Sequence, residues 1–352
     1  MNMYDLSFLH DKIVLISGGS GSIGKYLVKV ILQYSEVKAL RILSNDEDAL
    51  HTMNQETYGS HESKSKIRLL LGDIRDKERL IKASEGVDVI FHLAALKHVH
   101  ISEYNPFESV HTNVIGTQNI IDAAIINNVG RVILSSSDKA ANPSNVLGAT
   151  KLLSEKLITA ANTIKGMKRT TFSSVRFGNV LGSRGSVIHS IEQDIRAKRR
   201  VRLTHRDMTR FVISPESAVL LLFRSIDLMK GGEIFVFKMP SVRIYDLCLE
   251  ILRMCIVNDE NNKFEILGIR PGEKLHEDLI SEEESLRTVE LADMYVVLPT
   301  IPELYNSLSQ YYISIGATNA SYMGSYSSRA SSNILIKEDI RRLISEMHSE
   351  LA

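Results

Sequence analysis

Cysteine, proline and net charge are scarce in this sequence, and each shortage excludes a class of protein. The two cysteines, Cys248 and Cys255, stand seven residues apart in a helical pattern, which separates them by roughly 10 Å along the axis, too far for a disulfide. No second pair adds metal ligands, so we expect a reduced, cytoplasmic protein without a metal. Only 7 prolines occur, which argues against a disordered chain.

An excess of charge and a long apolar run are also missing. The 42 basic and 42 acidic side chains cancel, so a nucleic-acid partner is not expected. No apolar run approaches the roughly 18 residues of a membrane span, and residues 1–10 lack the charged start and apolar middle of a signal peptide. A chain of 352 residues is long enough for a large core in one or two domains.

A glycine-rich turn lies near the amino terminus, between an expected strand at residues 12–17 and an expected helix at 25–33. The spacing of Gly18, Gly21 and Gly24 is a variant of the dinucleotide fingerprint. Such glycines permit a tight turn and let backbone amides approach a pyrophosphate, which the helix amino end attracts. We therefore predict that a dinucleotide contacts Gly18, Gly21, Ser22, Ile23 and Gly24, although glycines also serve ordinary loops.

Further apolar runs predict strands at residues 39–43, 68–72, 87–93, 131–134, 170–176 and 233–238, separated by helical patterns. This alternation predicts an α/β fold with a doubly wound parallel sheet, which binds ligands at the carboxyl ends of its strands. The residues that follow three of these strands are the next cofactor candidates: Ser44, Asn45, Asp73, Ile74, Ala94 and Ala95. Asp46 could bind a ribose or cap a helix, and Asp73 could simply form a turn.

The stretch at residues 135–151 follows the expected strand at 131–134 and precedes a helix expected from Lys151 to Ala161. Its position places Ser136, Ser137, Asp138 and Lys139 in a crevice at the carboxyl edge of the sheet. Leu147 stands four residues before Lys151, which puts both side chains on one face.

These motifs resemble those of the extended short-chain dehydrogenase/reductases, which carry a serine and then a tyrosine and a lysine four apart. Leu147 takes the place of the tyrosine. The string Ser-Asp-Lys-Ala-Ala-Asn-Pro at residues 137–143 and the string Gly-Ile-Arg-Pro-Gly-Glu-Lys-Leu-His-Glu at 268–277 resemble the UDP-N-acetylglucosamine 4,6-dehydratases of capsular and flagellin-glycan biosynthesis. Some members of that branch keep the tyrosine, and others work with methionine there.

The resemblance covers residue 11 to the last expected helix at 335–350 and implies a domain organisation. We expect a Rossmann-type NAD(P)-binding domain at residues 1–181 with a return segment at about 212–245. Residues 182–211 and 246–352 are expected to form a smaller discontinuous substrate-binding lobe and the C-terminal segment. Residues 318–333, rich in Ser, Gly and Tyr, are expected to be flexible. A homo-oligomer is also expected.

The resemblance implies a three-step reaction in one pocket. The nicotinamide takes a hydride from C4 of the hexose, water is lost across C5 and C6, and the hydride returns to C6. Lys139 is expected to remove the C5 proton with a pKa lowered by its dry crevice, and Asp138 to protonate the leaving hydroxyl. Lys151 would bind the nicotinamide ribose, and Ser136 or Ser137 the 4-hydroxyl.

The same resemblance implies residues that hold the UDP-sugar and a tightly bound NADP or NAD. Lys97, Asn179, Arg210, Arg270 and Glu273 are expected to contact the substrate, with the arginines on the diphosphate, although Glu273 is a better candidate for holding its loop. Relatives carry arginine for the 2′-phosphate of NADP where this chain has Asn45, so the choice between the two cofactors stays open.

Two rival functions fit parts of the pattern. A UDP-sugar 4-epimerase would use the same binding residues but would not need Asp138 and Lys139, because it performs no elimination. A non-catalytic NAD(P)-binding sensor would account for Leu147, but it need not keep both Asp138–Lys139 and the two arginines. His92, His98 and His100 have no partner ligands that suggest a metal, and we expect none.

Overall fold

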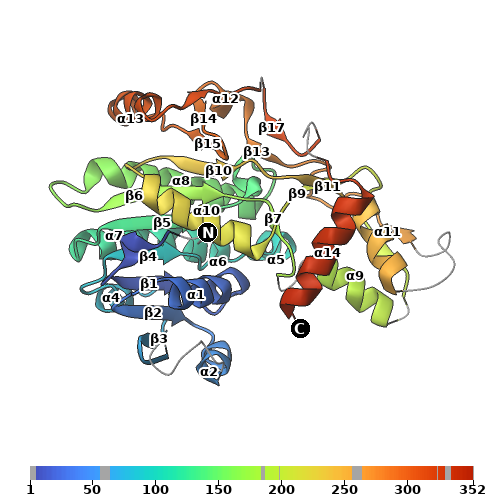
Figure 1. The fold of residues 1–352 in the computed structure, drawn as a ribbon, viewed down its shortest axis with the longest axis horizontal. Coiled ribbons are helices and arrows are strands. Elements are labelled where there is room, and N and C mark those ends of the chain that lie inside the picture. Colours follow the sequence, from blue (N-terminus) through green and yellow to red (C-terminus); the bar gives the residue numbers. More distant parts are fainter. Residues whose placement is uncertain are drawn as a thin grey trace.

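The computed structural model describes residues 5–55, 64–183, 187–197, 199–255, 264–322, 324–329 and 334–351. Its centre is a 10-stranded sheet in the order β16-β14-β15-β10-β6-β5-β4-β1-β2-β3 (Figure 1). The strands from β10 to β3 pair in parallel, whereas β14, β15 and β16 pair antiparallel at the β10 edge. The predicted doubly wound parallel sheet is confirmed.

The strands of the parallel part are short and apolar because helices cover both of their faces. They are β1 (Ile13–Ser17), β2 (Ala39–Ser44), β3 (Ile67–Leu71), β4 (Val89–His92), β5 (Arg131–Ser135), β6 (Thr171–Arg176) and β10 (Ile234–Phe237). One face packs on α1 (Ser22–Tyr34) and α10 (Pro215–Leu228). The other face packs on α4 (Lys77–Ala83), α7 (Gly116–Ile126) and α8 (Val146–Ile164).

Shorter helices connect the parallel strands. They are η1 (Ser7–Leu9), α2 (Glu47–Gln55), α5 (Val99–Tyr104), α6 (Pro106–Ser109), η2 (Val110–Ile115) and η3 (Asp138–Ala140). The helix expected from Lys151 begins earlier, at Val146, because the Asn145 side chain accepts a hydrogen bond from the Gly148 amide and caps it there. This cap places Leu147 in the first turn of α8.

The smaller lobe has its own apolar core, formed by residues from α9 (Val187–Arg196), α11 (Ile244–Cys255) and α14 (Lys337–Leu351) and from short strands. The strands are β7 (Asn179–Val180), β8 (Val201–Leu203), β9 (Thr209–Ile213), β11 (Ser241–Arg243) and β12 (Phe264–Ile266). They form one sheet in the order β11-β9-β7 and the pair β12-β8. The three helices lie together at the right of Figure 1.

Part of the carboxyl-terminal segment joins the large sheet. The C-terminal segment contributes β14 (Thr288–Glu290), β15 (Met294–Val297) and β16 (Thr318–Asn319) to the large sheet. All four residues of β15 are buried, so they cover an edge that β10 would otherwise expose. Two helices, α12 (Glu282–Ser285) and α13 (Pro302–Ser314), accompany them.

The segment expected to be flexible also forms structure where it is described. Besides β16, it contains β17 (Tyr326–Ser327), which pairs with β13 (Asp278–Ile280). Tyr326 stacks near Phe211 and Tyr295, with ring centroids 5.0 and 5.1 Å away. Aromatic packing therefore orders a segment whose polar composition predicts a loop. Residues 323 and 330–333 of this segment lie outside the described residues.

Candidate functional site

The glycine-rich turn lies against the ends of β2 and β4. Gly18 has φ +70°, and a Cβ there would stand 2.7 Å from Cα of Ala94. Its amide donates to the carbonyl of Leu43 at 2.8 Å. A Cβ on Gly24 would stand 2.5 Å from Cα of Gly19. Only glycine fits these contacts, which bring the turn, the start of α1 and Ala94 together as a dinucleotide cradle requires.

The ends of β2 and β3 also meet, as the cofactor prediction requires. The Asn45 amide donates to Asp73 at 3.2 Å, and Ser44 lies 2.7 Å from the Ser20 hydroxyl. Asp73 pairs with Arg75 at 2.7 Å, and this hydrogen bond lowers the pKa of the Asp73 carboxyl below its ordinary value. Asp46 accepts from the Ala49 amide at 2.9 Å. Of its two predicted roles, the structure shows helix capping.

The inner part of the cradle is formed by buried or half-buried residues. Ile74 is 5% exposed, and it packs where a Cβ on Gly116 would stand 2.6 Å from its Cδ1. Ala94 and Ala95 are half-buried, as are Ser22 and Ile23 in the first turn of α1. These residues fit the adenine, ribose and pyrophosphate of a nicotinamide dinucleotide, because small side chains and the amino end of a 13-residue helix face the same edge.

His92 is a structural residue at the end of β4. Its Nδ1 lies 2.7 Å from the Ser17 hydroxyl and its Nε2 lies 3.1 Å from the Thr117 hydroxyl. Burial, with a smaller effect of Lys151, lowers the pKa of His92 to about 3, so the ring is neutral. Thr117 donates its own proton to the Asn113 carbonyl, so Nε2 carries the ring proton and Nδ1 accepts from Ser17.

Asp138 and Lys139 occupy the short helix η3 directly after β5. Asp138 is fully buried, and its Oδ1 accepts from Lys139 Nζ at 2.9 Å and from the Ser137 hydroxyl at 2.7 Å. Its Oδ2 has no hydrogen-bond partner among the described residues, and neither has the buried Ser136 hydroxyl. The structure therefore brings the four predicted residues of this loop together around two unsatisfied oxygens.

The charge state of Lys139 differs from the expected one. Burial by itself would lower the pKa of Lys139, but the carboxylates of Asp138 and Glu277 outweigh it and raise the pKa above its ordinary value. The expected lowered pKa is wrong because the crevice, although dry, contains two carboxylates. In this structure Lys139 is an ammonium group and must lose a proton before it can act as a base.

Lys151 lies on α8, one turn after Leu147, and both side chains are buried. Its Nζ donates to the carbonyl of Ser135 at 3.0 Å. Burial lowers the pKa of Lys151 to about 8, with Glu155 acting in the opposite direction. A lysine that is still mostly protonated at neutral pH suits a hydrogen bond to ribose hydroxyls and the stabilisation of a negative charge nearby.

Glu277 is a site residue that the sequence prediction did not select. It is 4% exposed, and its Oε1 lies 3.8 Å from Lys139 Nζ and 4.0 Å from Arg210 Nε. Its Oε2 is buried without a hydrogen-bond partner in the described part of the chain. Burial and the Asp138 carboxylate raise the pKa of Glu277. Its place in the string 268–277 was the available signal.

The predicted substrate residues lie on different elements and differ in how exposed they are. Arg210, on β9, is 8% exposed and donates to the carbonyls of Thr209, Lys274 and Leu275. Asn179 begins β7, which pairs with β9. Lys97 and Arg270 are exposed and Glu273 is half-buried. Arg210 thus holds the 274–277 segment as well as facing the site, whereas Arg270 and Lys97 face solvent.

The turn at Pro271 and Gly272 is attached to the start of α8. The Gly272 carbonyl accepts from the Asn145 side chain at 2.8 Å and from the Ser144 hydroxyl at 3.2 Å. The Arg270 amide donates to the Glu273 carboxylate at 3.4 Å, in line with the loop-holding role expected of Glu273. The 268–277 string is therefore attached to Asn145, which caps α8, and it also meets the 137–143 string directly, because Lys274 Nζ donates to the Ala141 carbonyl at 3.3 Å.

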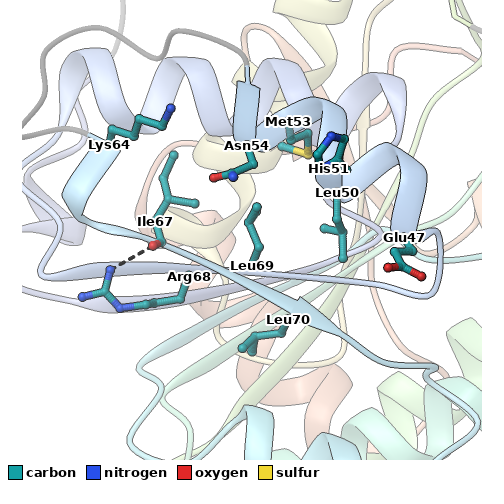
Figure 2. Close-up of a pocket in the computed structure, with 10 residues that line it drawn as sticks. All are labelled: Glu47, Leu50, His51, Met53, Asn54, Lys64, Ile67, Arg68, Leu69 and Leu70. Carbon is teal, nitrogen blue, oxygen red and sulfur yellow. Dashed lines mark hydrogen bonds between the residues drawn. The ribbon is translucent and has the colours of Figure 1, made fainter.

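A separate pocket of about 490 Å³ lies between α2 and β3, the outermost strand (Figure 2). Leu50 and Met53 of α2 and Ile67 and Leu69 of β3 line it. None of the predicted site residues lines this pocket. Across the described ranges, no group of three or more His, Cys, Asp or Glu side chains could hold a metal, and no described helix is long and apolar enough to cross a membrane.

Comparison with known proteins agrees with this geometry. The polysaccharide biosynthesis protein family matches residues 14–299. An uncharacterized membrane protein of Methanocaldococcus jannaschii is 50% identical over 83% of this chain and 87% of its own length. An inverting UDP-N-acetylglucosamine 4,6-dehydratase of Campylobacter jejuni is 43% identical over 82% and 84%. A UDP-glucose 4-epimerase of Rickettsia canadensis is 36% identical over 81% and 82%.

The solved structures include a match along almost the whole chain. The X-ray structure of Pen from Bacillus thuringiensis has a TM-score of 0.86 and 40% identity, and the match covers 96% of this chain and 98% of that one. The chain therefore belongs to the polysaccharide biosynthesis protein family, and the expected resemblance to the UDP-N-acetylglucosamine 4,6-dehydratases, which are lyases, is confirmed.

Proposed function

We propose that this protein is a 4,6-dehydratase that converts UDP-N-acetylglucosamine to a UDP-4-keto-6-deoxy-N-acetylhexosamine for surface polysaccharide or glycan biosynthesis. The observation that carries the proposal is the buried Asp138–Lys139 pair at the end of β5, with Lys151 on the adjoining helix. An elimination needs both an acid and a base beside the sugar, and this pair supplies them. The 43% identical dehydratase supports the choice of substrate.

Each residue of the loop has a distinct task in this proposal. The bound nicotinamide supplies the hydride acceptor for C4 and the donor for C6. Lys139 takes the C5 proton once it has lost its own, and Asp138 protonates the leaving C6 hydroxyl. Ser136, whose hydroxyl is buried without a partner among the described residues, or Ser137 holds the 4-hydroxyl, and Lys151 holds the ribose. The 4-hydroxyl proton leaves through Asp138, a serine or water, since Leu147 has no proton to exchange.

The binding residues divide between the two ligands. Gly18, Gly21, Ser22, Ile23, Gly24, Ser44, Asn45, Asp73, Ile74, Ala94 and Ala95 would hold NAD or NADP. Lys97, Asn179, Arg210, Arg270 and Glu273 would hold the UDP-sugar, with the guanidinium groups on its diphosphate. The enzyme is proposed to work as a homo-oligomer with a tightly bound cofactor.

A UDP-sugar 4-epimerase is the second candidate, because a UDP-glucose 4-epimerase is 36% identical to this chain. Epimerisation also begins with oxidation at C4, but it breaks no bond at C5 or C6. The buried acid and base beside each other therefore favour the dehydratase. A non-catalytic sensor is a third candidate, since a cofactor could bind the glycine-rich turn without any of this chemistry.

One experiment separates the three functions. The protein is incubated with UDP-N-acetylglucosamine in heavy water, and the products are followed by proton NMR. A new C6 methyl signal with deuterium at C5 is the expected result, and the configuration at C5 shows whether that centre is inverted. Formation of the 4-epimer alone would establish the epimerase, and nucleotide binding without turnover would establish the sensor.

A further inference from the structure

Four charged side chains form a closed cluster where the lobe meets the large domain. Asp138 and Lys139 come from η3, Arg210 from β9, and Glu277 from the residue before β13. Lys139 Nζ is the centre of the cluster, 2.9 Å from Asp138 Oδ1 and 3.8 Å from Glu277 Oε1. Asp138 Oδ2 and Glu277 Oε2 are both buried and lack hydrogen-bond partners in the described chain. Two carboxylates thus compete for one lysine in a crevice with little water.

Glu277 is fixed in this position by its backbone. Its amide donates to the Ser328 hydroxyl at 3.0 Å, and its carbonyl accepts from the Ser328 amide at 2.8 Å. Ser328 also lies 2.8 Å from the Thr209 hydroxyl. These bonds hold the carboxyl toward Lys139, while no side-chain donor satisfies its Oε2. At 3.8 Å, Glu277 Oε1 is beyond hydrogen-bond distance of Lys139 Nζ, so the lysine side chain must move closer for a proton to pass, while the backbone of Glu277 stays in place.

We propose that Glu277 exchanges a proton with Lys139 and thereby generates the free amine that removes the C5 proton, a role that rests on the proposed dehydratase function. In the exchange an N–H bond of the Lys139 ammonium breaks and an O–H bond forms on the Glu277 carboxylate. The pair keeps the same number of protons and the same net charge. Glu277 acts through Lys139, so it is a positioning residue that sets the charge state of the base.

The consequence is a particular pH dependence. Neutral Lys139 with protonated Glu277 holds as many protons as the Lys139 ammonium with the Glu277 carboxylate. The fraction of the neutral form therefore does not fall as pH falls, and the enzyme stays active well below the pKa of Lys139. The other charged groups that face Glu277 are Asp138, Arg210 and Lys274, and His276 lies beside it in the chain, next to Arg329 and Asp207. None of them donates a hydrogen bond to Oε2.

The test is the pH profile of kcat/KM for the wild type and Glu277→Gln. The amide keeps the shape but cannot take the proton, so Lys139 must release its proton to solvent. We expect the acidic limb to move to higher pH, with kcat/KM at neutral pH lower by about tenfold for each unit of that shift and recovery in alkaline buffer. Glu277→Asp should keep the limb in place, and Glu282→Gln, on the exposed start of α12, should match the wild type.

Two results would overturn the proposal. A loss that is uniform across pH would mean that Glu277 only holds the structure. A limb that moves to lower pH would mean that its charge merely raises the pKa of Lys139. A readout that needs no turnover separates this inference from the proposed function: an infrared titration should show a carboxylic acid band that Glu277→Gln removes. Absence of that band overturns the inference, whereas its presence without any dehydration overturns the proposed function alone.

Discussion

Two buried clusters of charged side chains differ in how completely their hydrogen bonds are made. Arg176, at the end of β6, is 0% exposed and donates to both oxygens of Glu155 and both oxygens of Glu284 at 2.6 to 2.8 Å. It also donates to the Leu279 carbonyl at 3.1 Å. Around Lys139, by contrast, one oxygen of each carboxylate has no partner among the described residues.

This difference distinguishes a cluster that stabilises the fold from one that is a candidate for catalysis. A buried charge is tolerated when its hydrogen bonds are all made, and the Arg176 cluster meets that condition while joining β6, α8 and α12. The carboxyl-terminal segment is thereby attached to the helix that carries Lys151. The oxygens without hydrogen bonds in the Lys139 cluster destabilise the fold. Buried groups of this kind are found at sites that bind a ligand or a proton.

The largest expected effect comes from removing the central cation of each cluster. Lys139→Met should lower kcat by about 10²–10⁴, because the base is lost. Arg176→Met should lower the free energy of unfolding by about 3–5 kcal/mol, since Glu155 remains buried without its cation and Glu284 keeps only Arg287, 3.6 Å away. Steady-state kinetics and denaturant unfolding measure the two. The comparison fails if Lys139→Met keeps kcat within tenfold of the wild type, or if the two variants unfold at the same denaturant concentration.

The matched variants Glu284→Gln and Glu277→Gln should change stability in opposite directions. Although burial opposes it, Arg176 lowers the pKa of Glu284 to about 2, so this carboxylate contributes stability above an unfolded pKa of about 4.3, and that stability is lost as pH falls through 2. Burial raises the pKa of Glu277, so its ionised form costs stability at neutral pH.

Thermal unfolding at neutral pH should therefore show a lower Tm for Glu284→Gln and an equal or higher Tm for Glu277→Gln. Below about pH 4, the loss caused by Glu284→Gln should shrink, because the unfolded wild-type chain then binds a proton at Glu284 that the folded chain does not bind until about pH 2. A Tm that drops equally in both variants would show that the two clusters are equivalent scaffolds.

The smallest effect concerns the turn at Gly272, which is attached to Asn145. Gly272 has φ +81°, and a Cβ there would stand 3.2 Å from Cβ of Asn145, whereas Gly268 has φ +83° with no atom within 4 Å. Gly272→Ala and Gly268→Ala should each cost about 1 kcal/mol from backbone strain. Only Gly272→Ala should also raise KM for the UDP-sugar, by a few-fold, because it displaces Asn145. Equal KM values in the two variants would refute this.

The sequence predicted the parts whose signals are local. Gly18, Gly21 and Gly24 identified the cofactor turn because a tight strand-to-helix connection needs residues without side chains. The apolar runs predicted each strand in the parallel part of the large sheet, since strands covered by helices on both faces are rich in apolar residues. Asp138 and Lys139 were found because they directly follow such a strand.

Pairings between distant parts of the chain were not predictable in the same way. The raised pKa of Lys139 depends on Glu277, and β14 to β16 join the large sheet although the regular alternation has ended before them. Asp46 shows the same limit, since its side chain is equally suited to a ribose or to the cap of α2 that it forms.

By itself, the sequence determined the doubly wound sheet, the glycine-rich turn after β1 and the position of Asp138 and Lys139 after β5, because each depends on neighbouring residues. Only the tertiary structure decided the charge state of Lys139. Glu277 reaches Lys139 from a segment far along the chain, and the attraction of Lys139 to Glu277 and Asp138 outweighs the effect of burial on its pKa.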